Sequence, residues 1–410
     1  MKSRLATYTF IILSLLLAGA YVVTWIPTLS NPADAVNRDF TIFATAATIA
    51  REHGYGEIYS ISRQIEAQTA IVGSPIQVKG GLLPFNHPPF LIPLLSLFFA
   101  STTSIYKAFL GWVVFNLLLF SLCLWLAYKI LNQAGWRPDQ TVLILVPLAL
   151  IFPLQTNLFQ GQDILFVLLG LLLFVRSLQT DNLLWGGLGL GLTTISPHLA
   201  LIFCIPIFFS TRKRFFAFAA GGAFFAIVSI ILIGMNGITD FLTMLSQTAS
   251  AEAGTYGVFK DQMFTFSSLV FRLWPAIPAT LLSTLTWAVY MGAILGLSWL
   301  HSSYKGATPN QLLYLTGFTI SIGLFFAPHL YGHGLLPLFI PFLAWGHYAV
   351  IGQNRPAVHI GLCLLLASVL MLFNLVPAIP LHQLWTFLVL IGTIFLSASA
   401  LKQSSQPSLT

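Results

Sequence analysis

The sequence predicts an all-α polytopic membrane protein, a single helical domain over residues 1–410 with about twelve transmembrane helices. The first observation is composition: 57% of the 410 residues are hydrophobic and 7% are charged, whereas a soluble domain carries about 25% charged residues. The second is that the apolar residues form runs long enough to cross a bilayer, with no convincing strand pattern between them. These observations exclude a soluble enzyme held by one anchor.

Neither the charge nor the cysteines indicate another class of protein. The net charge of +7 follows the predicted membrane topology, so it does not indicate a nucleic-acid partner. Cys123, Cys204 and Cys363 all lie inside apolar runs, which argues against disulfides or a metal cluster built from them.

The individual spans follow from the length of each apolar run, because a hydrocarbon core of about 30 Å needs about 20 helical residues. The first run continues past Ala20 to Ile26 without a clear cleavage site, so we expect an uncleaved span rather than a signal peptide. The pair within 183–210 is short and interrupted at Ser196-Pro197. The predicted spans lie near residues 7–26, 104–131, 140–155, 158–177, 183–195, 197–210, 215–234, 276–300, 310–327, 333–350, 357–376 and 380–401.

The apolar segment 88–100 is left out of this set. It opens on two prolines, contains Pro93 and runs only about a dozen residues, which suits a re-entrant or interfacial element. With this segment excluded, most of the 18 Lys and Arg residues fall in short cytoplasmic loops, as the positive-inside rule requires. Counting it as a span would put Arg212-Lys213-Arg214 outside. Both termini are therefore predicted to be cytoplasmic.

Two long polar stretches, about 27–103 and 235–275, fall on the outer face under this topology. Both contain aromatic and apolar residues, which argues for ordered loops, and long ordered loops usually carry function. The polar tail 403–410 is predicted to be flexible.

The first outer loop begins with an acid beside a base, Arg38-Asp39, at the head of a helical pattern. Phe40, Phe43 and Ala47 recur at helical spacing, which predicts an amphipathic helix. Such a helix is expected to lie in the plane of the membrane interface. Its first turn would hold Asp39 at the mouth of the membrane domain.

Other polar residues lie where apolar runs end. His329 and His333 are spaced i, i+4 at the outer end of a span, where they either bind a sugar phosphate or satisfy backbone carbonyls. No acid accompanies them in an HExxH-type pattern, which disfavours a metal. Asp163 is either functional, as intramembrane acids often are, or stabilised by a helix N-terminus. Lys260 and Arg272 contact an anionic group or are simply solvated.

Several motifs, in a consistent order along most of the chain, resemble the GT-C glycosyltransferases. More narrowly, the chain resembles glycosyltransferase family 87, the polyprenol-phosphate-mannose-dependent mannosyltransferases. Family members often have a Lys where Ser196 stands and an Asn where Asp261 stands. The motifs that carry the resemblance are Arg38-Asp39-Phe40, Gly56-Glu57-Ile58-Tyr59, Asn86-His87-Pro88-Pro89-Phe90, Gln160-Gly161-Gln162, Ser196-Pro197-His198, Asp261-Gln262 with Ser267, and Ala327-Pro328-His329 with Tyr331 and His333.

The resemblance implies a GT-C-type helical bundle that transfers a monosaccharide, mannose first, from a polyprenyl-phosphate donor by inverting displacement. Asp39 is the implied general base; the alternative is a carboxylate stabilised by the helix dipole. Asp34 is the next candidate for the base. Arg38 either meets the donor phosphate or pairs with a nearby acid.

The resemblance also bears on partners and location. The expected partners are the lipid-linked donor, a lipid or glycan acceptor and membrane lipids, with no nucleic acid, no soluble cofactor and no metal. The expected location is the bacterial cytoplasmic (inner) membrane, with the active site on its outer face. The residues implied to bind the donor are Arg38, His198, His329, His333, Lys260 and Arg272, and the other candidate site residues are Asp34, His87, Gln162, Asp163, Asp261 and Gln262.

Two other functional classes fit a protein with about twelve spans. A secondary transporter or lipid flippase usually shows two halves with matched broken helices, whereas the long outer loops here are asymmetric. An O-antigen ligase or polymerase also uses lipid-linked sugars on the outer face, but its long loop is expected late in the chain.

Overall fold

A computed structural model of the protein describes residues 2–74, 79, 81–100, 104–250, 255, 259–375 and 382–404. Within these ranges every regular element is helical, and the one β-type pairing is an isolated parallel bridge between Lys79 and Thr255. The predicted all-α class is confirmed. Most of the tail predicted to be flexible, residues 405–410, lies outside the described residues.

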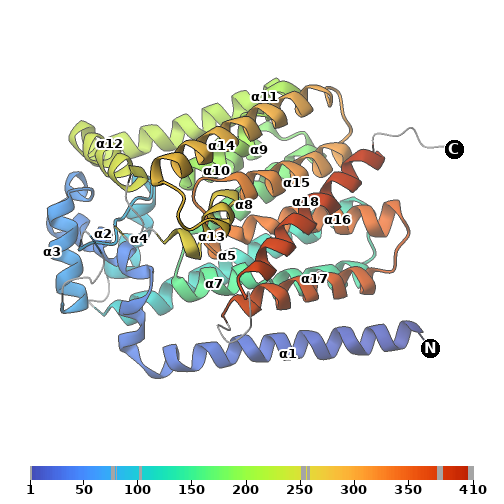
Figure 1. Ribbon diagram of the computed structural model, residues 1–410, viewed down its shortest axis with the longest axis horizontal. Coiled ribbons are helices and arrows are strands. Elements are labelled where there is room, and N and C mark those ends of the chain that lie inside the picture. The colour runs from blue at the N-terminus through green and yellow to red at the C-terminus, as the bar shows by residue number, and fades with distance from the viewer. Residues whose placement is uncertain are drawn as a thin grey trace.

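All the long helices belong to the body of the molecule, together with several short ones, whereas the two stretches predicted as outer loops contain mainly short helices (Figure 1). The body consists of α1 (Lys2–Ser30), α5 (Ile105–Gln133), α6 (Pro138–Ala149), α7 (Phe152–Gln160), α8 (Ile164–Thr180), α9 (Leu183–Leu192), η4 (Thr193–Ile195), α10 (Pro197–Cys204), α11 (Ile207–Ser210), α12 (Arg212–Ser250), α14 (Ala279–Ser302), α15 (Pro309–Phe326), η6 (His333–Leu338), α16 (Phe339–His347), η7 (Tyr348–Gly352), α17 (Ala357–Leu372), η8 (Phe373–Leu375) and α18 (Leu384–Ser404). The predicted loops contain η1 (Pro32–Asn37), α2 (Phe40–Glu52), η2 (Tyr55–Glu57), α3 (Ile61–Val72), η3 (Pro89–Leu91), α4 (Ile92–Ala100), η5 (Lys260–Gln262) and α13 (Phe266–Leu273).

The number of spans differs from the prediction. Among the described residues, seven helices are long and apolar enough to cross a membrane, or eight if α6 and α7, which are bent by 47°, form one span. The predicted count of twelve is therefore not confirmed. The helices between residues 164 and 210 are each shorter than a full span, and the chain breaks at Ser196-Pro197 as the sequence predicts. The predicted span 310–327 corresponds to α15, which is also not among the helices that qualify. The segment left out of the predicted set is also a short apolar helix, Pro89–Phe99.

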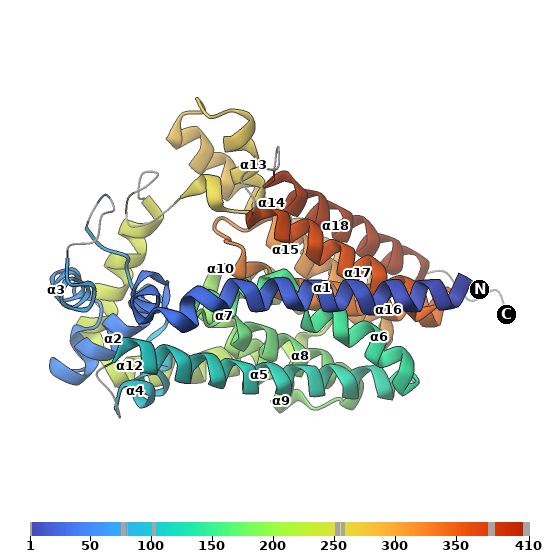
Figure 2. The ribbon, with the colours of Figure 1, turned by 90° about the horizontal axis from the view of Figure 1, so that it is seen from below.

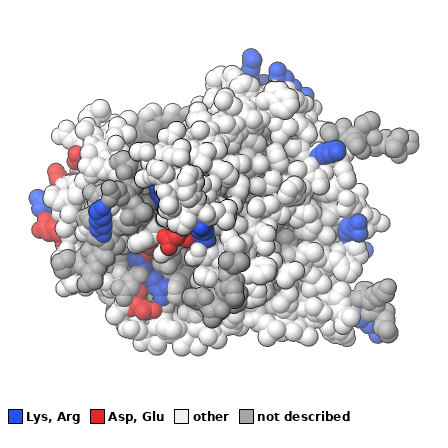
Figure 3. Space-filling view, in the orientation of Figure 1, with Lys and Arg blue, Asp and Glu red and all other residues white. Residues whose placement is uncertain are grey.

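The ends of the bundle differ in what they carry. The beginning of α1 and the end of α18 lie at one end, whereas α2, α3 and the last turns of α12 lie at the other (Figure 1). Helix α1 runs along the outside of the bundle, where it packs on α17 (Figure 2). On the face shown in Figure 3, Asp and Glu gather toward the α2 and α3 end, and the opposite end shows Lys and Arg.

Glycines let α9 pack tightly between α8 and α12. A Cβ at Gly170 of α8 would lie 2.2 Å from the carbonyl oxygen of Gly189, and a Cβ at Gly221 of α12 would lie 2.3 Å from that of Gly187. Real side chains do not tolerate such distances, so the backbones meet directly at these crossings. This kind of contact is common between helices in membranes, where small residues replace the hydrophobic effect as the basis of association.

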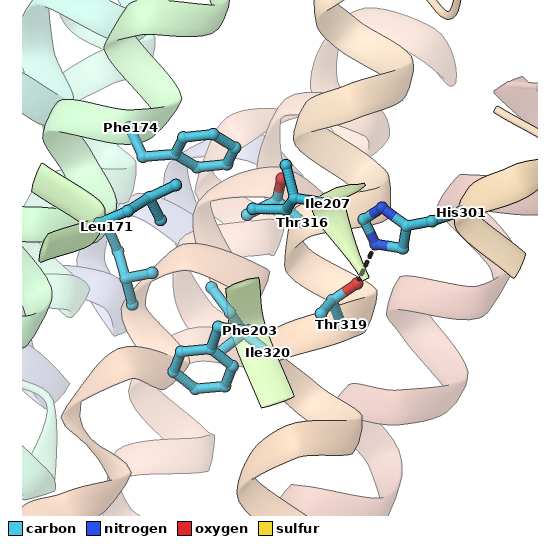
Figure 4. A pocket seen from close by; sticks show the side chains of 9 residues that line it. Leu171, Phe174, Phe203, Ile207, His301, Thr316, Thr319 and Ile320 are labelled. Atoms are coloured by element: carbon cyan, nitrogen blue, oxygen red, sulfur yellow. Dashed lines mark hydrogen bonds between the residues drawn. The ribbon is translucent and has the colours of Figure 1, made fainter. Parts of the chain in front are cut away.

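A buried cluster of hydrogen-bonded side chains links three helices at some distance along the bundle from the predicted site residues. The imidazole of His301 on α14 hydrogen-bonds with Thr319 on α15 at 2.9 Å and with Ser210 of α11 at 3.0 Å. Figure 4 shows His301 and Thr319 beside a small cavity of about 10 Å³ lined mainly by apolar side chains such as Phe174 and Phe203. We assign this cluster to packing, because a buried imidazole must have hydrogen-bond partners.

The helix predicted to lie in the membrane interface is buried within the protein. Helix α2 begins at Phe40, directly after Asp39, both Phe40 and Phe43 are 0% exposed, and the helix packs against α3 and α4. The short helices of the first loop cover its polar face as well. Its place in the plane of the membrane interface stays a prediction.

The second stretch predicted as a loop is partly a continuation of α12. Gly234 has φ 66° and ψ −178°, a conformation that is essentially restricted to glycine, and the helix kinks there. The predicted span 215–234 ends at this kink. The residues beyond it stay helical and bring Leu245 and Thr248 over the cavity described next.

Candidate functional site

A cavity of about 530 Å³ collects most of the predicted site residues. Its first wall comes from the first loop and the α7–α8 turn, its second from the chain around η5, α13 and residues 327–334, and its third from α10, α12 and α14. The polar and titratable residues on these walls are Asp39, Asn86, His87, Gln162, Asp163, Ser196, His198, Thr248, Lys260, Ser267, Ser268, Ser283, Thr286, Tyr290, His329, Tyr331 and His333.

Asp39 lies at the N-terminus of α2 and is held by the α7–α8 turn. The side-chain amide of Gln162 donates a hydrogen bond of 2.8 Å to Oδ2 of Asp39. The backbone N–H of Asp39 donates to Oε1 of Gln160 at 3.3 Å. Two glutamines, one on each side of Gly161, therefore fix both the backbone and the carboxylate of this residue.

Gly161 makes that turn possible. It ends α7 with φ 70°, in the left-handed region, and a Cβ there would lie 2.8 Å from Cβ of Phe40. The carbonyl of Gly161 also accepts a hydrogen bond of 2.8 Å from the indole of Trp112. Only glycine satisfies both the backbone conformation and the close approach of α2.

His87 and Asp163 form a second polar pair on the same wall. Nδ1 of His87 lies 2.8 Å from Oδ2 of Asp163, which directly precedes α8 and is 3% exposed. The imidazole packs against two aromatic rings, with centroid distances of 4.7 Å to Phe43 and 5.5 Å to Phe85, and these two rings also contact each other at 5.9 Å. The hydroxyl of Tyr59 donates a hydrogen bond of 2.5 Å to the carbonyl of His87.

Two buried glutamines of α3 hold the extended segment that leads to His87. Oε1 of Gln64 accepts from the N–H of Phe85 at 2.9 Å, and Oε1 of Gln68 accepts from the N–H of Leu83 at 3.1 Å. The i, i+4 spacing places both amides on one face of the helix, where they bond the chain much as a neighbouring strand would. Sequence reasoning missed these residues, since isolated glutamines in a polar loop carry no distinctive signal.

The second wall presents two imidazoles around a tyrosine. The rings of His329 and Tyr331 lie 4.9 Å apart between centroids, and those of Tyr331 and His333 lie 6.1 Å apart. His198, at the start of α10, approaches His329 with 6.5 Å between ring centroids. His329 precedes η6 and His333 begins it, so the loop, rather than one helix face, brings the two together.

The protonation of this wall follows from its burial. Burial, with smaller contributions from the neighbouring His198 and His333, lowers the pKa of His329 from 6.5 to about 3. His329 is therefore neutral at ordinary pH and acts as a hydrogen-bonding group, not as a cation. Burial also raises the pKa of Tyr331 to about 12, which keeps its hydroxyl protonated.

Lys260 is the cationic residue among the described residues that line the cavity. Two backbone contacts hold its loop over the second wall: the N–H of Phe259 donates to the Tyr331 hydroxyl at 3.0 Å, and the N–H of Phe264 donates to the carbonyl of Leu330 at 2.9 Å. Burial lowers the pKa of Lys260. The ammonium group is thus partly stripped of water before any anion arrives.

The third wall is largely apolar and reaches the outside of the bundle. Leu201 of α10 and Trp287 of α14 both line the cavity, yet they are 46% and 47% exposed on the molecular surface. The same wall contains Tyr290, whose hydroxyl donates a hydrogen bond of 2.6 Å to the carbonyl of His198. Sequence reasoning missed the α14 residues, because they belong to an apolar span that differs little from its neighbours.

Five of the predicted site residues do not line the cavity. Arg38 donates to Asp34 at 3.0 Å and to Thr28 at 2.6 Å, and its guanidinium lies 3.3 Å from the centroid of the Phe159 ring. Arg272 donates hydrogen bonds to the backbone carbonyls of Asp261 and Met263, and these bonds fix the loop that carries Lys260. The predicted residues outside the cavity lining are Asp34, Arg38, Asp261, Gln262 and Arg272.

The arrangement provides two carboxylates, several hydrogen-bonding groups, one ammonium group and apolar lining residues that are also exposed on the outside of the bundle. Among the described residues, no three His, Cys, Asp or Glu side chains lie close enough together to hold a metal ion. Such a cavity is suited to a ligand that is partly polar and partly apolar.

Comparisons with known proteins return one match. The model of glycosyltransferase family 87 matches residues 85–328, more than half of the chain. The matched region contains His87, Gln162, Asp163, His198 and Lys260. No curated protein and no solved structure matches the chain.

Proposed function

The chain belongs to glycosyltransferase family 87, and from this premise we propose that Asp39 is the general base of its transfer reaction. The family consists of membrane glycosyltransferases of the GT-C type that depend on polyprenyl-phosphate sugars. We further propose that the sugar is mannose, that the acceptor is a lipid or glycan, and that transfer takes place on the outer face of the bacterial cytoplasmic membrane.

The hydrogen bond between Gln162 and Asp39 carries this proposal. Asp39 lies before the matched region, whereas Gln162 lies inside it. A general base has to be held within reach of the proton that it removes, and Gln160 and Gln162 hold Asp39 at the cavity wall from both sides.

In the proposed reaction, a hydroxyl of the acceptor attacks the anomeric carbon of the donor while Asp39 takes its proton. A bond forms between this carbon and the acceptor oxygen, and the bond to the phosphate oxygen breaks with its electron pair on the phosphate. The anomeric configuration inverts because attack and departure take place on opposite faces of the sugar.

The second wall supports stabilisation of the departing phosphate. Its charge increases as the bond breaks, and preorganised cations and hydrogen-bond donors stabilise such a charge most strongly where water is excluded. Lys260 supplies the cation and His329 a neutral imidazole, while His198 approaches His329 from the third wall. Arg38 and Arg272 contribute indirectly, through the loops that they hold.

The third wall is suited to the lipid part of the donor. An isoprenoid chain cannot enter water, so it has to reach the cavity from the bilayer. Leu201 of α10 and Trp287 of α14 line the cavity and are also exposed on the outside of the bundle, which favours entry of the lipid chain at this wall.

The test is transfer of a labelled sugar by the purified protein. Wild-type protein with radiolabelled polyprenyl-phosphate mannose and membrane lipid extract should form a labelled product. Asp39→Asn and Asp39→Ala should abolish the product, whereas Asp240→Asn, at an exposed carboxylate on α12, should leave it unchanged. Undiminished transfer by both Asp39 variants would remove this residue from the role of base.

Two further measurements address the rival functions and the topology. A labelled solute that crosses a liposome wall without covalent change would favour a transporter or flippase, and labelled polysaccharide joined to a lipid core would favour an O-antigen ligase. A periplasmic reporter fused near residue 250 should be active, and a cytoplasmic signal there would contradict the proposed orientation.

A further inference from the structure

The pair of His87 and Asp163 has no role in the reaction as described so far, although it shares a wall with the base. Asp163 follows Gln162 directly in the chain, and Gln162 bonds Asp39. Asp39, His87 and Asp163 all line the same cavity. The pair and the base can therefore exchange a proton through the space that they share.

His87 differs from the other imidazoles of the cavity in its partner. Its Nδ1 lies 2.8 Å from the carboxylate of Asp163, and among the described residues no other histidine that lines the cavity forms an ion pair. The environment of His329 keeps it neutral. A carboxylate beside Nδ1 leaves Nε2, on the other side of the imidazole, as the nitrogen that can exchange a proton.

The reaction creates a need for such a group. After each transfer, the proton of the acceptor hydroxyl resides on Asp39, which has to lose it before the next turnover. The amide nitrogen of Gln162 can only donate. Arg38 is already bonded to Asp34 and Thr28. Neither of these neighbours can take the proton.

We propose that His87, oriented by Asp163, accepts the proton from Asp39 and passes it to bulk water. This inference rests on the proposed function of Asp39. The proton moves from the Asp39 carboxyl to Nε2 of His87, either directly or through a water or an acceptor hydroxyl in the cavity. The imidazolium, paired with the Asp163 carboxylate, then releases it. The electron pair of the broken sugar–phosphate bond stays on the phosphate, so charge and atoms balance without a further reactant.

The titratable groups around His87 come from three elements. Asp163 lies beside it at the start of α8, Asp39 and His333 line the same cavity from the starts of α2 and η6, and Phe43 and Phe85 pack against its ring. His87 is the proton-accepting group, and Asp163 is a positioning residue.

The first experiment is chemical rescue. His87→Ala should lower kcat about 100-fold, the usual contribution of a positioned acid–base group, with little change in the KM for the donor. Added imidazole should restore a large part of the lost rate by occupying the vacated space. His359→Ala, at an exposed imidazole on α17, is the matched control and should change neither the rate nor its response to imidazole.

A second set of variants covers the case in which His87→Ala does not fold. His87→Gln and Asp163→Asn keep side chains of similar size, and each should lower kcat with the thermal midpoint of the protein nearly unchanged. The double variant should be no slower than the slower single variant, because the two residues act as one unit. Multiplying losses would overturn the coupling.

The outcomes separate this inference from the proposed function. If wild-type protein forms no product, or if Asp39→Asn remains active, the proposed function fails. If wild-type protein is active and Asp39→Asn is not, but His87→Gln turns over at the wild-type rate, the proton-accepting role alone is overturned. A slow, folded His87→Ala variant that imidazole does not accelerate would likewise assign His87 to packing.

Discussion

The side-chain amide of Gln162 lies 2.8 Å from a carboxylate oxygen of Asp39, although 123 residues separate them in the chain. This contact joins the predicted base to the turn between α7 and α8. It also joins a residue before the matched family region to one inside it.

Gln162→Leu should lower kcat about tenfold to a hundredfold with the donor KM little changed. A hydrogen bond to a charged group contributes about 1.5–3 kcal/mol, and each 1.36 kcal/mol is tenfold in rate. Gln162→Glu should be slower still, because a second carboxylate would face Asp39. Gln353→Leu, at an amide that bonds Tyr348 outside the cavity, is the control. Unchanged kcat in both Gln162 variants would contradict the positioning role.

Lys260→Gln should raise the KM for the polyprenyl-phosphate donor about tenfold or more, because the cavity would lose the cation that faces it. Steady-state kinetics with varied donor measure this effect. Lys305→Gln removes an exposed positive charge between α14 and α15 and should leave the KM as it is. An equal rise in both variants would point to a general effect of charge on donor binding.

Gly161→Ala should destabilise the protein and lower its activity. The left-handed backbone costs about 1–2 kcal/mol for a residue with a Cβ, and the new methyl group would lie 2.8 Å from Phe40. Gly292→Ala is the matched control, since nothing lies within 4 Å of its added Cβ. Thermal unfolding in detergent compares the two. Equal unfolding midpoints in the two variants would show that α2 can move away from the turn without loss of stability.

Gly221→Ala should destabilise the bundle, whereas Gly222→Ala should not. The added Cβ would lie 2.3 Å from the carbonyl oxygen of Gly187 in the first case, and 3.9 Å from a methyl group of Thr194 in the second. Overpacking of this kind typically costs about 1–3 kcal/mol. Unfolding midpoints of the two adjacent variants provide the comparison. A stable Gly221→Ala protein would mean that α9 and α12 can separate without loss.

Acidification below pH 6.5 should destabilise the folded protein partly through His329. The unfolded chain binds a proton on this residue near pH 6.5, but the folded protein resists protonation down to a pKa of about 3. The unfolded state therefore binds more protons between these values, so stability rises with pH across that window. The midpoint of His329→Asn should fall less than that of the wild type between pH 7 and pH 4.5. Parallel curves would contradict the assignment.

The class of protein could be predicted from the sequence because it depends on local properties. A long apolar run enters the bilayer core, where no water is present to bond its backbone N–H and C=O groups. These groups therefore bond one another, and the run forms a helix. The break at Ser196-Pro197 and the start of α2 after Asp39 were predictable for the same reason, since both follow from residues next to each other.

The cavity could be predicted only in part. The motifs supplied Asp39, His87, His198 and His329, which the fold brings together. They also supplied Arg38, which the fold turns away from the cavity to bond Asp34. The sequence does not reveal in which direction a charged side chain next to the base points. The neighbouring helices determine its direction and therefore its partner.

Sequence alone thus determined that the chain is an all-helical membrane protein and that its polar motifs occur in the order typical of one enzyme family. Only the tertiary structure decided that α2 is buried among the short helices of the first loop, that Gln162 holds Asp39, and that His87 is paired with Asp163. Hydropathy and helical period are properties of neighbouring residues. A hydrogen bond across the cavity wall depends instead on how closely helices that are far apart in the sequence pack together. At Gly161, the close packing of α2 is possible because this residue has no side chain.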